Sequence, residues 1–122
     1  MVDHAPQLHV EHINGVTLVT FPRIDMGEGA ALAIESQLFP LAEKPGCTQF
    51  VLSLSRVRCL SSTMLGKLIA FNKQVKQRAG ELILCSLSPD LAARFESMRL
   101  NKLFHICPNE EEALGEVSAS IA

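Results

Sequence analysis

The stretch Cys59-Leu60-Ser61-Ser62-Thr63-Met64-Leu65-Gly66-Lys67-Leu68 lies where a buried strand should give way to a helix. A short apolar run over residues 50–54 precedes it. Within this stretch and beyond it, residues spaced three or four positions apart fall on one face of a helix: Leu65, Leu68, Ile69, Asn72 and Val75. Three hydroxyl side chains, those of Ser61, Ser62 and Thr63, therefore fall at the predicted start of this helix.

This hydroxyl cluster has two interpretations. Ser and Thr are good N-terminal caps, because a hydroxyl oxygen accepts a hydrogen bond from an unpaired backbone N–H. The same helix start also favours an anion, because free N–H groups and the positive end of the helix dipole point at it. Chemistry alone favours capping, and the sharper hypothesis is a phosphorylation switch or a contact site for a partner.

Three segments, taken in order, resemble the STAS domain family, whose best-known members are bacterial anti-sigma factor antagonists. They are residues 50–68, 80–89 and 100–106. In that family a strand of the type V-x-L-D-L-S is followed by a loop and then by D-S-S-G-L-G at the start of a helix. Leu65 and Gly66 match that motif. At the other positions this chain has Ser53 in place of the first Asp and Ser61 in place of the second. Ser62 and Thr63 stand at the two serine positions, and Met64 replaces the first glycine.

The resemblance implies a regulatory binding protein that is switched by phosphorylation. In the family the unmodified form binds an anti-sigma factor, often a serine kinase, and frees the sigma factor. The kinase then phosphorylates the serine and breaks the complex, and a phosphatase resets it. Ser62 is the matching position and Thr63 is the second candidate. A phosphoryl group adds about −1.5 to −2 charge, which changes the contacts of a surface without changing the fold.

The resemblance also implies where the partner binds. The expected contact residues are Asp25, Arg58, Ser61, Ser62, Thr63 and Met64. Asp25 matches the Asp of a G-x-L-D element that lies beside the phosphorylated serine in relatives. Capping of the first helix by Asp25 is an equal alternative. Met64 puts a flexible apolar side chain where the family has glycine, and this side chain is a candidate new contact.

Two other functions stay open. The chain could be a docking or scaffold protein that is never phosphorylated, with the hydroxyl cluster serving only as a cap. It could also be a small-ligand sensor that uses a pocket near Asp25 and the segment from Ser61 to Met64.

Composition narrows the class of protein. With 122 residues and a formal net charge of −2, the sequence predicts one domain over residues 1–122 and gives no sign of nucleic-acid binding. It contains neither a membrane-length apolar run nor a signal peptide, so we expect a cytoplasmic protein. A homo-oligomer is left open.

Enzyme and metal signatures are missing from the sequence. It carries no nucleotide-binding glycine loop, no G-x-S-x-G elbow and no evident base for Ser62, so we expect neither catalysis nor a cofactor. The four cysteines are far apart and form no C-x-x-C pair, which argues against zinc. Cys59 and Cys85 sit in apolar segments and are interpreted as small core residues.

The order of the predicted elements gives an α/β fold of the STAS type. Strands are expected at 7–13, 16–21, 49–54, 81–85 and 103–106, with Asn14-Gly15 as a hairpin turn. Four helices are expected. The first covers 30–41 and is ended by Pro40, and the second runs from 62 to Gly80, which takes a left-handed conformation. The third begins at Pro89 and packs Phe95 and Met98 inside, and the fourth begins after Asn109. The alternation predicts a mostly parallel sheet with an N-terminal hairpin edge and about four flanking helices.

Overall fold

A computed structural model describes residues 7–22, 28–58 and 60–121. The strands are β1 (His9–Ile13), β2 (Val16–Thr20), β3 (Gln49–Ser53), β4 (Glu81–Cys85) and β5 (His105–Cys107). The helices are α1 (Glu28–Glu43), α2 (Ser62–Gln77), α3 (Pro89–Ser97) and α4 (Glu110–Ile121), with a short 3₁₀ turn, η1 (Leu100–Lys102). The predicted order of strands and helices is therefore confirmed.

The five strands form one sheet in the order β1-β2-β3-β4-β5. β1 and β2 pair antiparallel, and every later neighbour pairs parallel, from β2 and β3 through β4 to β5. The tight turn between β1 and β2 uses Asn14 and Gly15 with φ of 49° and 84°, the conformation that Asn-Gly favours in a hairpin. The hairpin edge and the parallel remainder match the sequence prediction.

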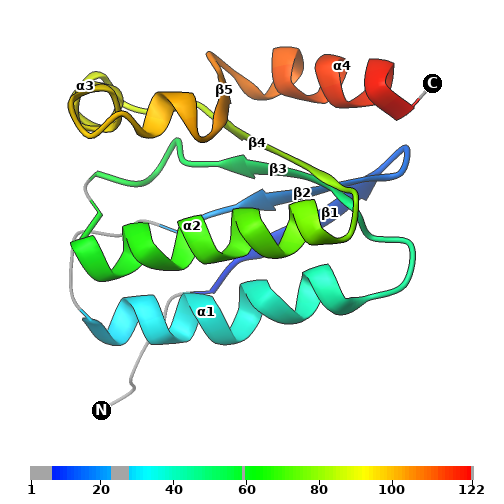
Figure 1. Ribbon diagram of the computed structural model, residues 1–122, viewed down its shortest axis with the longest axis horizontal. Coiled ribbons are helices and arrows are strands. Elements are labelled where there is room, and N and C mark those ends of the chain that lie inside the picture. The colour runs from blue at the N-terminus through cyan, green and yellow to red at the C-terminus, as the bar shows by residue number, and fades with distance from the viewer. Residues whose placement is uncertain (1–6, 23–27, 59, 122) are drawn as a thin grey trace.

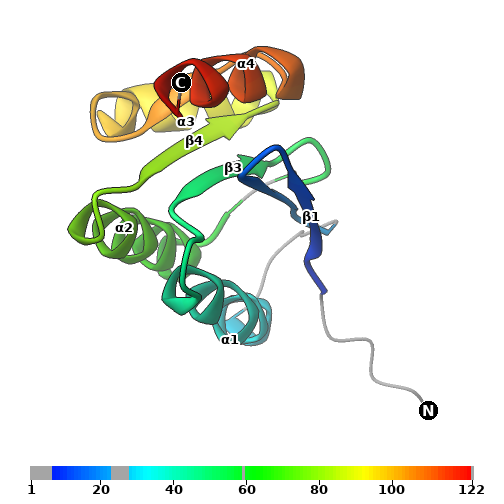
Figure 2. The same cartoon turned by 90° about the vertical axis from the view of Figure 1, so that its right-hand side faces the viewer.

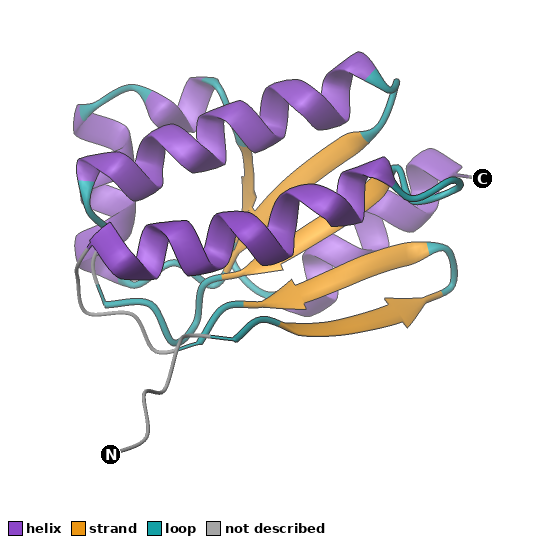
Figure 3. Cartoon of the chain, turned by 90° about the horizontal axis from the view of Figure 1, so that it is seen from below, coloured by secondary structure: helices purple, strands orange, loops and turns teal. Residues whose placement is uncertain are grey.

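Helices cover both faces of the sheet (Figures 1 and 2). α1 and α2 lie side by side on one face, as Figure 3 also shows, and α4 covers the opposite face. Because successive side chains along a strand point to opposite faces of the sheet, the core is divided into two clusters, one on each face. Phe50, Leu52 and Leu84 pack with α1 and α2 in the larger cluster, whereas Val51 and Ile83 pack with α4 in the smaller one.

Pro40 does not end the first helix, contrary to the prediction from sequence. α1 includes Pro40 and continues to Glu43. An interior proline costs about 3 kcal/mol, because its ring removes one N–H and crowds the preceding turn. Leu41 and Ala42 follow it and are buried, so the hydrophobic gain of packing this last turn offsets that cost.

Two smaller expectations, for Gly80 and for Met98, were also wrong. Ala79, with φ of 59°, takes the left-handed position after α2 that was assigned to Gly80. Gly80 is required for a different reason, because a Cβ there would lie 2.1 Å from the Thr48 carbonyl oxygen. Met98 is 47% exposed, since α3 ends at Ser97 and Met98 lies beyond its packed face. Ile69 is 36% exposed at the margin of the buried face of α2.

Candidate functional site

The turn that enters α2 is built on Ser61. Ser61 has extended backbone angles, φ −72° and ψ 163°, and its Oγ accepts a hydrogen bond from the Met64 N–H at 3.1 Å. Its carbonyl oxygen accepts the first bond of the helix from the Leu65 N–H at 3.0 Å. Ser61 is therefore the N-cap of α2, which confirms the capping interpretation for this one member of the hydroxyl cluster.

Arg94 fixes the chain just before this cap. Its guanidinium donates a hydrogen bond to the carbonyl oxygen of Leu60, from a half-buried position on α3. Leu60 itself is 1% exposed, so its carbonyl could not find water easily in place of Arg94. The helical spacing that Arg94 shares with the apolar Leu91 and Phe95 places a charged residue beside the packed face of α3, but it does not indicate which carbonyl Arg94 contacts.

Ser62 and Thr63 are exposed in the first turn of α2, and Met64 is not. Met64 is 2% exposed and belongs to the larger core cluster. The expectation that its side chain lies on the surface as a partner contact is therefore wrong: it supports the turn from inside. The reason is the helical period, since position 64 precedes Leu65 and Leu68 on the face that packs on the sheet.

Gly66 lies four residues after Ser62, on the same side of the helix. It is exposed, and a Cβ placed there would meet nothing within 4 Å. The fold itself therefore does not need glycine at this position. The backbone of α2 is open to close approach one turn below Ser62.

The start of α2 differs in charge from the starts of two other helices. Its first turn holds no acidic residue, whereas the first turn of α3 holds Asp90 and that of α4 holds three glutamates, Glu110, Glu111 and Glu112. The positive end of its dipole is thus not balanced by a carboxylate within that turn. Arg56 and Arg58 are exposed in the preceding loop, and Lys67 pairs with Glu35 of α1 at 2.9 Å.

Asp25 and Cys59 lie outside the described residues, so the structure says nothing of their expected roles. Ser53, which stands where the family has Asp, is fully buried, and its Oγ lies 3.5 Å from Ser55 Oγ. A neutral hydroxyl suits such a buried strand end better than a carboxylate without a positive partner would.

Two surface hollows on the described part of the chain lie away from the start of α2. One, of about 610 Å³, is lined by Gln49, Lys76, Ala79, Gly80, Glu81, Leu82 and His105. The other, of about 430 Å³, lies between α2 and the residue that follows η1 and is lined by Ile69, Asn72, Lys73, Lys76, Gln77 and Leu103. These hollows give no support to a small-ligand pocket beside Ser61 and Met64.

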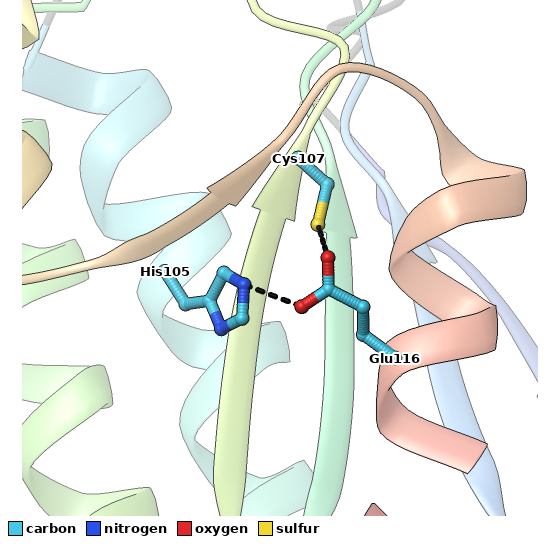
Figure 4. A group of neighbouring side chains, drawn as sticks. All are labelled: His105, Cys107 and Glu116. Atoms are coloured by element: carbon cyan, nitrogen blue, oxygen red, sulfur yellow. Dashed lines mark hydrogen bonds and ion pairs between the residues drawn. The ribbon is translucent and has the colours of Figure 1, made fainter. Parts of the chain in front are cut away.

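A second group of reactive side chains lies between β5 and α4 (Figure 4). Glu116 Oε1 stands 2.7 Å from His105 Nε2, and Glu116 Oε2 accepts a hydrogen bond from Cys107 Sγ at 3.1 Å. Burial, followed by the nearby Glu116 carboxylate, raises the pKa of the Cys107 thiol to about 12. Reasoning from sequence missed this group, because residues 105 and 107 meet residue 116 only through the packing of α4 on the sheet.

Comparison with known proteins identifies the family. Residues 7–113 match the family model of the STAS domain, and the chain belongs to that family. It is 26% identical over 111 residues to the anti-sigma F factor antagonist of Paenibacillus polymyxa, covering 91% of this chain and 94% of the relative.

Solved structures share the fold. A Thermotoga maritima protein described as a candidate anti-sigma factor antagonist superposes with a TM-score of 0.83 at 20% identity, over 91% of this chain and 94% of that one. The phosphorylated form of the Bacillus cell fate determinant SpoIIAA superposes with a TM-score of 0.67 at 18% identity, over 91% of this chain and 99% of that one. Among the described residues, we find no helix with the length and apolar character needed to cross a membrane.

Proposed function

We propose that this protein is an anti-sigma factor antagonist whose binding surface surrounds the start of α2, and that phosphorylation of Ser62 turns this binding off. The observation that carries the proposal is the exposed Ser62 in a capped first turn that holds no acidic residue. The family and its relative from Paenibacillus polymyxa support the class of partner. Thr63, also exposed in the same turn, is the second candidate for modification.

The physical basis is a change of surface charge on a rigid support. Ser61 caps the helix and Arg94 holds the preceding loop, so the turn keeps its shape when Ser62 changes. A phosphate on Ser62 adds about −1.5 to −2 charge next to the positive end of the α2 dipole, where an anion is tolerated. The fold then stays intact, while a partner surface that fits a neutral hydroxyl meets repulsion and a desolvation cost.

The contact surface consists of side chains that this turn and its loop expose. Ser62, Thr63 and the half-buried Ser61 lie at its centre, and Arg58 lies at the end of the preceding loop. Asp25 joins the surface by its position in the family motif. Gly66 extends it, because a partner can reach the helix backbone there.

The partner is an anti-sigma factor of the serine-kinase type, and a phosphatase restores the unmodified form. This role is regulatory binding in the cytoplasm, and it requires neither catalysis nor a cofactor. Two structures of SpoIIAA, one of the unphosphorylated and one of the phosphorylated form, support the idea that this fold accommodates the modification.

The test compares partner capture by three forms of the full chain. Tagged wild type, Ser62→Ala and Ser62→Glu are expressed in the cells of origin, and captured proteins are identified by mass spectrometry. Gln77→Glu is the matched control, since it adds the same charge to an exposed position of α2, about 22 Å along the helix axis. We expect wild type, Ser62→Ala and Gln77→Glu to capture an anti-sigma factor, and Ser62→Glu to capture at least about tenfold less.

Equal capture by all four proteins would contradict the switch. It would favour the docking alternative, in which Ser61 acts only as a cap and Ser62 has no regulatory part. Capture of no anti-sigma factor by any form would contradict the proposed class of partner.

A further inference from the structure

His105, Cys107 and Glu116 bring three donor atoms of different kinds close together (Figure 4). The imidazole nitrogen, the thiol sulfur and the carboxylate oxygen all lie within 4.8 Å of one another. These groups serve no purpose in the proposed partner surface, which lies at the start of α2. They also differ from a chance acidic cluster, because only one of the three is a carboxylate.

The fold explains why they meet. Residues 105 and 107 are two apart on β5, so their side chains share one face of the strand. Ile106, between them, packs into the cluster on the other face. α4 lies across the face that carries Cys107, with Ala113 and Val117 in the same buried cluster as that cysteine. Glu116 precedes Val117, and its carboxylate reaches both strand residues.

We propose that His105, Cys107 and Glu116 form a binding site for one Zn²⁺ ion, with a fourth coordination position open to water or to a ligand from a partner. Imidazole, thiolate and carboxylate are all ordinary Zn²⁺ ligands, and the presence of sulfur selects against Mg²⁺ and Ca²⁺. A bound thiolate and a carboxylate together carry two negative charges, which balance the charge of the ion.

The distances fit this ion after a small adjustment. Zinc bonds of about 2.0–2.3 Å in a tetrahedral arrangement place neighbouring donor atoms about 3.3–3.6 Å apart. The present separations from Glu116 are 2.7 Å to His105 Nε2 and 3.1 Å to Cys107 Sγ. Opening these two distances takes less than about 1 Å each, and the donor atoms of His105 and Cys107, which lie within 4.8 Å of each other, must also come to about 3.6 Å. The side chains of Glu116 and His105 are 47% and 45% exposed, so both have room to rotate.

Two further features match a metal site. Glu81 Oε2 lies 4.0 Å from His105 Nδ1, so the ring nitrogen that faces away from the cluster has a carboxylate nearby. Ligating histidines typically donate their other N–H to such a group, which makes Glu81 a positioning residue. A metal ion can reach the site from solvent, because the His105 side chain is 45% exposed. Cys107 is only 2% exposed and holds the buried end of the site.

The experiment measures metal binding by the full chain without an affinity tag. The protein is stripped with a chelator, kept reduced with a phosphine and titrated with Zn²⁺ in competition with a chromophoric chelator. Co²⁺ is added in a parallel experiment, because a thiolate-to-cobalt charge-transfer band reports a Co–S bond directly. Circular dichroism confirms that each variant is folded.

The variants separate this site from the other thiols. Cys107→Ser and His105→Ala remove ligands, Glu81→Gln removes only the positioning group, and Cys47→Ser removes a half-buried thiol outside the cluster. His105→Ala keeps the test valid if Cys107→Ser fails to fold, since the His105 side chain is nearly half exposed.

We expect one equivalent of Zn²⁺ and a Co–S band in wild type and in Cys47→Ser. Cys107→Ser should lose the band, both ligand variants should lose at least about 100-fold in affinity, and Glu81→Gln about 10- to 100-fold. Absence of stoichiometric binding to wild type, or unchanged affinity in Cys107→Ser and His105→Ala, would overturn the proposal. Neither result depends on whether Ser62 is phosphorylated.

Discussion

Replacing Ser61 by Ala should destabilise the protein by a predictable amount. The substitution removes the Oγ that accepts the hydrogen bond from the Met64 N–H and leaves this donor without its capping partner. Loss of a Ser N-cap typically costs about 1 kcal/mol, within a range of about 0.5–2 kcal/mol. At about 2.1 cal/mol/K per residue, a chain of 122 residues has an unfolding entropy near 0.26 kcal/mol/K, so 1 kcal/mol corresponds to about 4 °C in Tm.

Urea unfolding followed by circular dichroism, together with calorimetry, measures this loss. Ser61→Asp is the informative companion variant, because Asp is an equally good cap and places a negative charge at the α2 dipole. We expect Ser61→Asp to match or exceed wild type in stability. Ser36→Ala, at an exposed position within α1, is the control and should change stability by less than about 0.5 kcal/mol. A Ser61→Ala protein as stable as wild type would refute the capping argument.

Three further outcomes are expected. Arg94→Met should lower the free energy of unfolding by about 1–3 kcal/mol in urea titration, because it leaves the buried carbonyl of Leu60 without its charged donor; no loss would contradict the anchoring role. Gly66→Ala should raise stability by about 0.5–1 kcal/mol, since the added Cβ meets nothing, yet weaken partner capture; stronger capture would contradict close approach at that turn. Cys85 should react with iodoacetamide far more slowly than Cys47 in the folded protein, followed by peptide mass spectrometry, because Cys85 is buried and burial raises the pKa of its thiol; equal rates would contradict this.

Local rules in the sequence predicted local features of the structure. Asn14 and Gly15 form the expected hairpin turn, because that pair adopts positive φ at little cost. Ser88 and Asn109, which directly precede the predicted starts of the last two helices, cap α3 and α4, with hydrogen bonds of 3.2 Å and 2.9 Å from the Leu91 and Glu112 N–H groups. Each of these features depends on a few neighbouring residues, so one sequence is enough to find it.

Features that depend on tertiary packing were missed or misassigned. The burial of Leu41 and Ala42 keeps Pro40 inside α1, and the Thr48 carbonyl determines why residue 80 is glycine. Arg94 reaches a carbonyl 34 positions away in the sequence. No spacing rule connects such partners.

The candidate site shows the same division. Ser61 as a cap followed from the residue type, and the burial of Met64 could have been read from the helical period that places Leu65 and Leu68 in the core. The contact of His105 and Cys107 with Glu116 could not have been predicted from the sequence, because it depends on where α4 packs on the sheet.

Intact-mass measurement of the protein purified from its own cells, with mapping of any phosphate, tests the central proposal most directly. Our account predicts a fraction of molecules that carry one phosphate on Ser62, and loss of that species in Ser62→Ala. A protein that stays unmodified under all growth conditions while still binding its partner would contradict the switch, as would a phosphate level unchanged by Ser62→Ala.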